Sequence, residues 1–295
     1  MTEPVVGTLR VREERMAWAF LALPLLVLGG LVLYPLAFNI WISLHRVGIG
    51  NLRGPWEWAG LSNFRELARH REFLPAVLTT VFYSVAAAAL SVLLGLLAAL
   101  VLNRSFPGRA WVRGLCLFPF VSPVVAVAFV WRWLLDPDGV LNWLLFGIGL
   151  LPRPMAFLSE RGWALASVIL FEGWRYFPFV MLMAIARLQA IPGYLYEAAQ
   201  LDGAGAWMRF RHVTLPELRY VLGVLFLLRL MWTFNKFDDI YLLTSGAAGT
   251  KVLPILVYEF SFGTSRFGMG AATAMVLFAL LLVLLPVYVR KVLKW

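Results

Sequence analysis

Six long apolar runs limit what this chain can fold into. A helix rises 1.5 Å per residue, so about 20 apolar residues are needed to cross the hydrocarbon core of a bilayer. In lipid the backbone must satisfy its own hydrogen bonds, which a helix does within one segment. Runs of about the required length lie at 17–43, 73–102, 114–131, 162–186, 220–243 and 267–289. The sequence therefore predicts an all-α integral membrane protein with six transmembrane helices.

The composition agrees with this class and excludes others. Of the 295 residues, 61% are apolar and only 14% are charged, which is about half the charged share of a soluble domain. The net charge of +10 comes from Lys and Arg scattered between apolar runs, so no nucleic-acid partner is expected. A single cysteine, Cys116, allows no disulfide within the chain and no cysteine-based zinc site. The pair Asp136 and Asp138 lies in a sequence typical of a turn, and no bound metal is expected.

The distribution of positive charge predicts the orientation in the membrane. With six crossings both termini lie on one side, and Lys and Arg are enriched in cytoplasmic segments. The segments on the side of the termini hold slightly more Lys and Arg in fewer residues, so we expect both termini in the cytoplasm. The first run is too long for a signal peptide and is expected to stay in the protein. Residues 139–151 are apolar but too few to cross, which predicts a short helix at the outer surface.

The segment between the fourth and fifth runs, residues 188–218, is more structured than a plain connector. Pro192 can start a helix, good helix formers come after it, and Gly203 permits a sharp turn. A second helix is expected over 204–212, before Pro216 opens the fifth crossing. An apolar tip with an acidic rim would fit a groove in another protein. The side chains expected at this surface are Leu195, Leu201, Trp207 and Phe210, with Glu197 and Asp202 beside them.

This segment resembles the Glu-Ala-Ala loop of permease subunits in bacterial ATP-driven importers. In that family the loop carries the coupling helix, which fits into a cleft of the cytoplasmic ATPase subunit and transmits its closure. The resemblance implies the type I ABC importer permease fold with a cytoplasmic coupling helix. The residues that it implies for coupling to the ATPase are Glu197, Ala198, Ala199, Asp202, Gly203, Ala204, Phe210, Leu215 and Pro216.

The resemblance extends over almost the whole chain and is to the carbohydrate-uptake branch of that family. Its motifs are residues 60–64, 118–120, 131–133, 232–238 and 243–244. The sequence departs from the branch at 245–248, where Gly-Gly-Pro is usual, and at Tyr220, where proline is frequent. The implied organisation has a cytoplasmic N-terminus, first helix and outer loop over 1–72, an importer transmembrane domain over 73–290 and a cytoplasmic tail over 291–295.

The resemblance also implies partners and a location. They are a second permease subunit, with a heterodimer expected, two copies of a cytoplasmic ATPase subunit and an extracytoplasmic solute-binding protein. The location is the cytoplasmic membrane of a bacterium or archaeon. The sequence has no Gly-x-x-x-x-Gly-Lys-Ser/Thr motif, so this chain is not expected to be an enzyme or to bind a cofactor. ATP and Mg²⁺ are expected on the partner ATPase.

The fourth and fifth runs each carry a polar stripe. A charge near the bilayer centre is costly, so these side chains are expected to face protein or water. Guanidinium and carboxylate groups bind hydroxyls, and an aromatic face covers the apolar side of a sugar ring. The stripes therefore predict a substrate pathway for a hydrophilic solute, and they coincide with the ligand-facing positions of maltose-type relatives. At spacings of i, i+3, i+4 and i+7, the residues are Glu172, Arg175, Tyr176 and Phe179, then Arg229, Trp232, Thr233 and Lys236.

Alternatives stay open for the stripes and for the function. Glu172 and Arg175 could neutralise each other as a buried pair, and Arg229 could pair with Asp238 or Asp239. If the partner permease held the ligand, this stripe would be vestigial. The favoured function is a permease subunit for a sugar, oligosaccharide or related polyol, working by alternating access. The alternatives are an importer permease for an amino acid or peptide and a secondary carrier driven by an ion gradient.

Overall fold

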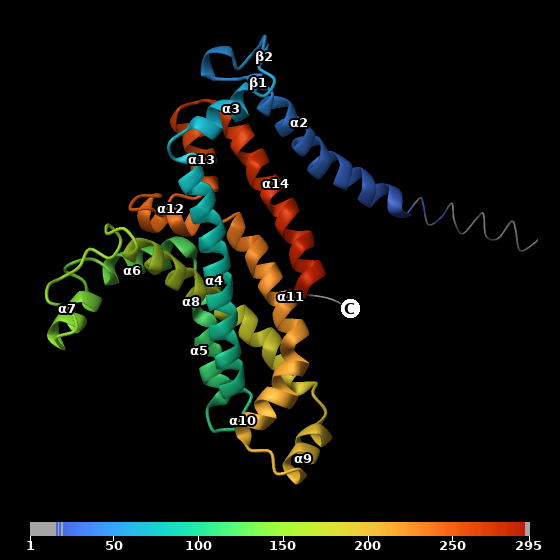
Figure 1. Cartoon of the computed structure of the whole chain (residues 1–295), viewed down its shortest axis with the longest axis vertical. Coiled ribbons are helices and arrows are strands. Elements are labelled where there is room, and N and C mark those ends of the chain that lie inside the picture. The colour runs from blue at the N-terminus through green and yellow to red at the C-terminus, as the bar shows by residue number, and fades with distance from the viewer. Residues whose placement is uncertain (1–15, 17, 19, 293–295) are drawn as a thin grey trace, which may run out of the picture. The chain divides into compact units, whose positions relative to one another are not determined.

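The computed structural model describes residue 16, residue 18 and residues 20–292. Over these residues the protein is mostly helical, and its two strands, β1 (His45–Arg46) and β2 (Glu57–Trp58), form one short antiparallel pair (Figure 1). The predicted all-α class is confirmed. The chain divides into two compact units, one containing residues up to 67 together with 259–275, the other containing 68–258 together with the residues from 276 onward.

The described part of the first unit contains a helix that runs from Phe20 to Ser43. Residues 17 and 19 of the first predicted crossing lie outside the described residues. Asn63 of α3 (Ser62–Arg69) is tied to the end of this helix, because its amide donates to the carbonyls of Ser43 at 2.8 Å and His45 at 2.9 Å. The elements of this unit, besides the strands and most of α3, are the π-helical turn Gly29–Leu33, α2 (Tyr34–Ser43), the 3₁₀ turn Ile49–Asn51, the π-helical turn Glu259–Gly263 and the start of α14 (Phe267–Val292).

The second unit is built around α4, α8 and α11, and α4 packs on both of the others. Figure 1 shows α9 and α10 at one end of α4, with α12 nearer its other end. The helices of this unit, besides the end of α3 and the part of α14 from residue 276 onward, are α4 (Phe73–Leu102), α5 (Arg109–Val121), α6 (Val124–Leu134), α7 (Val140–Gly147), α8 (Trp163–Gln189), α9 (Gly193–Leu201), α10 (Ala206–Arg209), the π-helical turn Phe210–Thr214, α11 (Leu215–Phe234), α12 (Asp238–Thr244) and α13 (Leu253–Tyr258).

Small residues let α4 and α8 approach closely. A β-carbon on Gly95 of α4 would lie 2.5 Å from the β-carbon of Val180 on α8. A β-carbon on Gly173 of α8 would lie 2.6 Å from the side chain of Leu90 on α4. In a membrane, helices associate by such close packing because lipid is as apolar as the side chains themselves. This interface fixes the position of the polar side chains that α8 carries.

Four helices are long and apolar enough to cross a membrane, namely Phe20–Ser43, Phe73–Leu102, Trp163–Gln189 and Phe267–Arg290. They coincide with the first, second, fourth and sixth predicted crossings. The third predicted crossing is not one continuous helix, because α5 and α6 meet at a bend of 95°. Pro123 causes the break, since the residue before a proline avoids the helical conformation and Ser122 is extended, with ψ 144°.

The fifth predicted crossing, 220–243, is also not one helix. Helix α11 begins at Leu215, with Pro216 in its first turn, and ends at Phe234. A break over 235–237 separates it from α12, whose first turn holds Asp238 and Asp239. Acidic side chains favour a helix N-terminus, so this sequence starts a new helix where the apolar pattern predicts a continuous one. Among the described residues the number of spans is therefore four, or five if α5 and α6 together make one.

The short helix expected within 139–151 is present as α7 (Val140–Gly147). Its Asn142 is buried and donates to the carbonyls of Asp136 at 2.8 Å and Met155 at 2.9 Å. The adjacent Trp143 is 74% exposed. The amide of Asn142 thus anchors a helix whose apolar side chains remain largely uncovered within the chain.

Candidate functional site

The segment 188–218 forms the helix–turn–helix predicted from its sequence. Helix α9 ends at Leu201, Gly203 turns the chain with φ +79°, and α10 comes after it (Figure 1). The second helix starts at Ala206, two residues later than predicted, and continues through a π-helical turn into α11. The turn needs glycine because positive φ is strained for other residues.

The side chains of this segment differ widely in exposure. Leu201 is 90% exposed and Trp207 is 69% exposed, as predicted. Leu195 and Phe210 are less exposed than predicted, because both are half-buried: Leu195 packs against the core under α9, and the Phe210 ring lies 5.5 Å from that of Trp207. Of the other residues implied in coupling, Glu197, Ala198, Asp202, Gly203, Leu215 and Pro216 are exposed, whereas Ala199 and Ala204 are half-buried.

Two contacts that the sequence did not indicate hold this segment on the bundle. The Tyr196 hydroxyl lies 3.1 Å from the Thr214 hydroxyl, which joins α9 to the start of α11. Arg187, near the end of α8, forms an ion pair with Glu217 and donates to its carbonyl at 3.1 Å. The opposite charges of Arg187 and Glu217, on either side of this segment, are the sequence feature that could have indicated the ion pair. The inner side of the segment is therefore fixed, and its outer side is left uncovered.

A buried charge network forms where α4, α8 and α11 meet. Arg229 on α11 donates to Glu172 on α8 at 2.6 Å, and neither side chain has exposed surface. Thr233 Oγ1 lies 3.3 Å from the Arg229 guanidinium and 3.4 Å from Glu172. From α4, Ser91 accepts a bond from Arg229 at 3.3 Å. The pairings considered from the sequence, Glu172 with Arg175 and Arg229 with an aspartate, are wrong because the partners sit across the helix interface.

Arg175 instead stabilises the break between α5 and α6. It donates to the carbonyls of Pro119 at 3.3 Å and Ser122 at 2.9 Å. In an unbroken helix the Pro119 carbonyl would accept the N–H of residue 123, but proline has none. A buried carbonyl without a donor is costly, and the guanidinium supplies one. The bend thus explains why an arginine is retained in an apolar interior.

Lys236 lies just beyond the end of α11 and extends the network. Its ammonium donates to the Tyr176 hydroxyl at 2.7 Å and lies 3.1 Å from Asp238 and 3.3 Å from Asp239. The Tyr176 ring also covers the Arg229 guanidinium at 4.0 Å, an attractive cation–π geometry. Tyr176 therefore touches both cations of the network.

Aromatic rings form a row beside these charges. The centroids of Phe179 and Trp232 lie 5.2 Å apart, and those of Phe120 and Phe179 lie 6.2 Å apart. Trp232 is 45% exposed and Phe120 is 37% exposed. Phe120 comes from the Phe-Pro-Phe sequence of α5, to which the sequence pattern assigned no role in the pathway. The predicted stripes therefore separate into a buried charged part and an accessible aromatic part.

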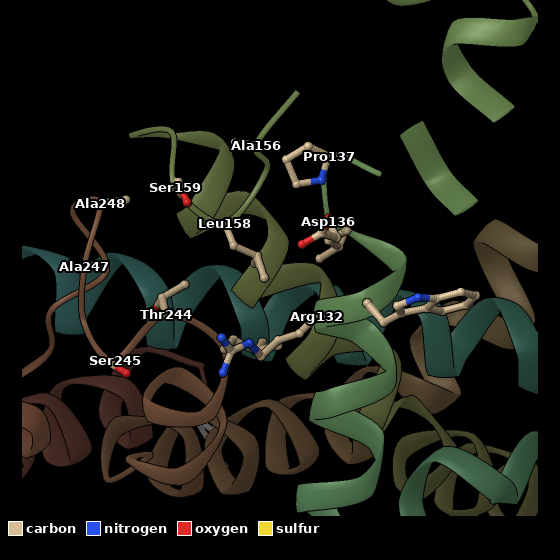
Figure 2. A pocket seen from close by; sticks show the side chains of 13 residues that line it. Arg132, Asp136, Pro137, Ala156, Leu158, Ser159, Thr244, Ser245, Ala247 and Ala248 are labelled. Atoms are coloured by element: carbon tan, nitrogen blue, oxygen red, sulfur yellow. The ribbon is translucent and has the colours of Figure 1, made fainter. Parts of the chain in front are cut away.

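A cavity of about 470 Å³ lies between the end of α6, residues 156–159 and the turn after α12. Figure 2 shows the Arg132 side chain extending from α6 toward the turn that carries Thr244. Its guanidinium donates to the Leu242 carbonyl at 3.5 Å. The expected turn at 136–139 closes one side, with the Gly139 N–H bonded to the Asp136 carbonyl at 2.8 Å. Within the part of the chain that the structure describes, no three His, Cys, Asp or Glu side chains gather to hold a metal ion.

Comparisons with known proteins agree with the resemblance seen in the sequence. The inner membrane ABC transporter permease protein YcjO of Escherichia coli K12 is 36% identical over 271 residues, 90% of this chain and 90% of that protein. The trehalose/maltose transport system permease protein MalF of Thermococcus litoralis is 32% identical over 292 residues, 98% of each chain.

A solved structure and a family model extend the comparison. A bacterial ABC transporter involved in the import of the acidic polysaccharide alginate matches with a TM-score of 0.80 at 24% identity, over 95% of this chain and 96% of that chain. The likeness confirms the predicted importer-permease fold. The family described as binding-protein-dependent transport system inner membrane component matches residues 91–294. This chain belongs to that family of inner membrane transport components.

Proposed function

We propose that this chain is a permease subunit of an ATP-driven importer for a sugar, oligosaccharide or related polyol. Membership of the family makes it a transport component of an inner membrane rather than an enzyme. Beyond this membership, the proposal assigns ATP hydrolysis on a partner subunit as the energy source and assigns the other subunits, the orientation in the membrane and the class of solute. The observation that carries it is the exposed helix–turn–helix at 193–209, held on the bundle from one side only.

The exposed face of this segment has the features of a docking surface. Leu201 and Trp207 present apolar surface to solvent beside the exposed carboxylates of Glu197 and Asp202. Exposed apolar groups rimmed by charge mark a protein-binding surface. We assign it to two copies of a cytoplasmic ATPase subunit, one for each permease of a pair, and place ATP and Mg²⁺ on those subunits.

The anchoring contacts give a route for mechanical coupling. A displacement of α9 would reach α11 through Tyr196 and Thr214, and α8 and α11 are joined by Arg187 and Glu217. The same two helices carry the Glu172–Arg229 pair. Closure of the ATPase would therefore move α8 and α11 together. Alternating access requires such a packed unit to have two arrangements that ATP binding biases.

A second permease subunit is proposed because the row of aromatic rings is open on one side in this chain. Trp232 is nearly half exposed, and a solute pathway needs a second wall to exclude lipid. A heterodimer would allow the two walls to differ. An extracytoplasmic binding protein would deliver the solute, in keeping with the family description. The membrane is the cytoplasmic membrane of a bacterium or archaeon, with 188–218 and both termini in the cytoplasm.

The chemistry of the pathway supports a sugar as the solute. Phe179 and Trp232 offer ring faces that suit the apolar side of a pyranose, and Tyr176 and Lys236 offer donors for hydroxyls. Glu172 and Arg229 neutralise each other out of contact with solvent, so they would support this wall rather than touch the solute. MalF of Thermococcus litoralis is named for trehalose and maltose, which supports the same class.

The coupling role is tested by Glu197→Lys in the assembled transporter. Reversing this exposed charge should detach the ATPase during purification and abolish uptake, while the permease stays folded in the membrane. Glu160→Lys, which reverses the charge of another exposed carboxylate outside the segment, is the control and should retain the ATPase. Normal co-purification and uptake in Glu197→Lys would refute the role.

The driving force and the solute need separate measurements. Uptake into vesicles that contain the complex should require ATP on the side of the membrane that holds the ATPase and should not depend on a proton or sodium gradient. Gradient-driven uptake without ATP would favour the secondary carrier instead. A ligand screen on the associated binding protein should select a sugar or polyol, and selection of an amino acid or peptide would overturn the proposed solute class.

A further inference from the structure

The buried charge network holds more carboxylates than cations. Glu172, Asp238 and Asp239 face the two cations Arg229 and Lys236. Asp238 is 45% exposed and can be solvated, but Glu172 and Asp239 have no exposed surface. An unpaired carboxylate is expensive to bury, so the excess negative charge requires an explanation.

The hydrogen bonds show where the excess lies. Neither carboxylate oxygen of Asp239 has a hydrogen-bond donor, and Oε2 of Glu172 has none. Glu172 Oε1 is the oxygen that Arg229 binds. Lys236 lies 3.3 Å from Asp239 but directs its bonds to Tyr176 and Asp238. The unsatisfied oxygens therefore belong to two carboxyl groups on neighbouring helices.

These two carboxyl groups lie within hydrogen-bonding reach of each other. When both are ionised, each can only accept a hydrogen bond, and their charges repel. One proton between them removes the repulsion and provides the missing donor. Two carboxyl groups held together commonly share one proton for this reason.

The charged groups around this pair favour a proton over a metal ion as the positive charge that the two carboxyl groups bind. Arg229 already occupies one side of Glu172, so a metal cation there would meet a fixed positive charge. The hydroxyl of Tyr83 on α4 is buried near both carboxyl groups and makes no hydrogen bond. Other charged or titratable side chains on the elements packed around the pair include Arg175 and Tyr176 on α8, Lys236, Asp238 and Tyr241 at α12, Arg132 on α6 and Tyr258 on α13; Arg187 on α8 and Glu217, Arg219 and Tyr220 on α11 lie at the far ends of those helices.

We propose that Glu172 and Asp239 form a proton-binding site and share one proton at neutral pH. The carboxylate of Asp239 takes a proton from solution, and the resulting O–H donates to Oε2 of Glu172. The shared proton leaves two negative and two positive charges in the network and ties α12 to α8. The proton belongs to the resting protein, and the site does not depend on which solute is transported.

The test is infrared spectroscopy of the purified transporter complex in lipid nanodiscs, recorded without solute or ATP. At neutral pH the wild-type spectrum should contain the C=O stretch of a protonated carboxylic acid, and the band should shift in D₂O. Asp239→Asn keeps a donor for Glu172 and should remove the band. Glu160→Gln, which neutralises an exposed carboxylate outside the network, is the control and should leave the band unchanged.

Two outcomes would overturn the proposal. One is the absence of a protonated carboxyl band in the wild-type complex, and the other is its persistence in Asp239→Asn. If Asp239→Asn does not fold, Asp239→Ser replaces it, because a serine hydroxyl is also a donor for Glu172 and has no carboxyl group, and the band should again be lost. A band that persists in Asp239→Ser would also refute the shared proton. Because no transport is measured, failure here is distinct from failure of the proposed function.

Discussion

The exposed segment 193–209 and the buried charge network use charged side chains in opposite ways. Glu197 and Asp202 have open surface around them and stand beside uncovered apolar side chains. Glu172 and Arg229 are enclosed and bind each other at 2.6 Å. The first region leaves apolar surface uncovered within this chain, whereas the second has most of its charged groups paired within the chain.

This difference separates two roles that the sequence alone does not separate. A charge in an apolar run indicates function by default, because lipid does not tolerate it. Here the enclosed charges hold α4, α8 and α11 together, and the more accessible surface beside them is mainly aromatic. Removal of a buried charge should therefore damage folding, and removal of an exposed charge from segment 193–209 should damage only the proposed coupling.

The largest effect is expected for Arg229→Met. It leaves Glu172 charged, buried and without its partner, which typically costs about 3 to 5 kcal/mol. The folded permease should be lost from the membrane, as measured by size-exclusion chromatography of a fluorescent fusion. Arg219→Met removes an exposed arginine from the same helix and should leave the elution profile unchanged.

The double variant Glu172→Gln with Arg229→Met sharpens this prediction. It removes both charges, so most of the lost stability should return even though the hydrogen bond is gone. If the double variant is as unstable as Arg229→Met alone, the uncompensated charge is not the cause and packing at this position must be.

The next effect is expected for Gly203→Pro in the exposed segment. Gly203 has φ +79°, which proline cannot adopt, and its N–H donates to the Gln200 carbonyl at 3.0 Å. The turn should open, ATPase co-purification and uptake should be lost, and the elution profile of the permease should not change. Gly193→Ala, in open space at the start of α9, is the control and should retain both activities. Loss of the folded permease in Gly203→Pro would contradict the separation of roles.

The sequence predicted local structure well wherever one segment determines it. The helix–turn–helix results from Pro192, the helix formers after it and Gly203, all within one stretch of chain. The apolar runs that became single helices are likewise local. The bend at Ser122–Pro123 was missed because apolar periodicity continues through it, although the proline was the available signal.

The partners of the charged residues could not be predicted in the same way. Pairing within one helix was the alternative considered for Glu172 because Arg175 lies three residues away. The true partner, Arg229, is 57 residues away and meets Glu172 only after α8 and α11 pack. The carbonyls bound by Arg175 became available only because α5 ends early. Both outcomes depend on tertiary contacts that one sequence does not reveal.

A smaller effect is expected for Gly95→Ala, which adds bulk to the core beside the network. The new β-carbon would lie 2.5 Å from that of Val180, so α4 and α8 must separate slightly. Overpacking of this kind costs about 1 to 3 kcal/mol, partly offset by the higher helix propensity of alanine. The midpoint of thermal unfolding should fall. Gly114→Ala on α5, with nothing near its β-carbon, should not lower it, and equal midpoints for the two variants would contradict close packing.

The smallest effect is expected for Glu72→Gln, which breaks an exposed ion pair instead of a buried one. Lys251 donates to Glu72 at 2.9 Å and holds the pKa of that carboxyl below its usual value. Both side chains are partly exposed, so the pair should contribute only about 0.5 kcal/mol. Because the pKa is lower in the folded protein, the stabilisation is present above the ordinary carboxyl pKa and is lost as the pH falls through the folded value. The wild type should therefore unfold at a slightly higher temperature than Glu72→Gln at neutral pH, and the two should converge in acid. A difference that persists in acid, or one as large as that of Arg229→Met, would show that exposure does not set the strength of an ion pair in this protein.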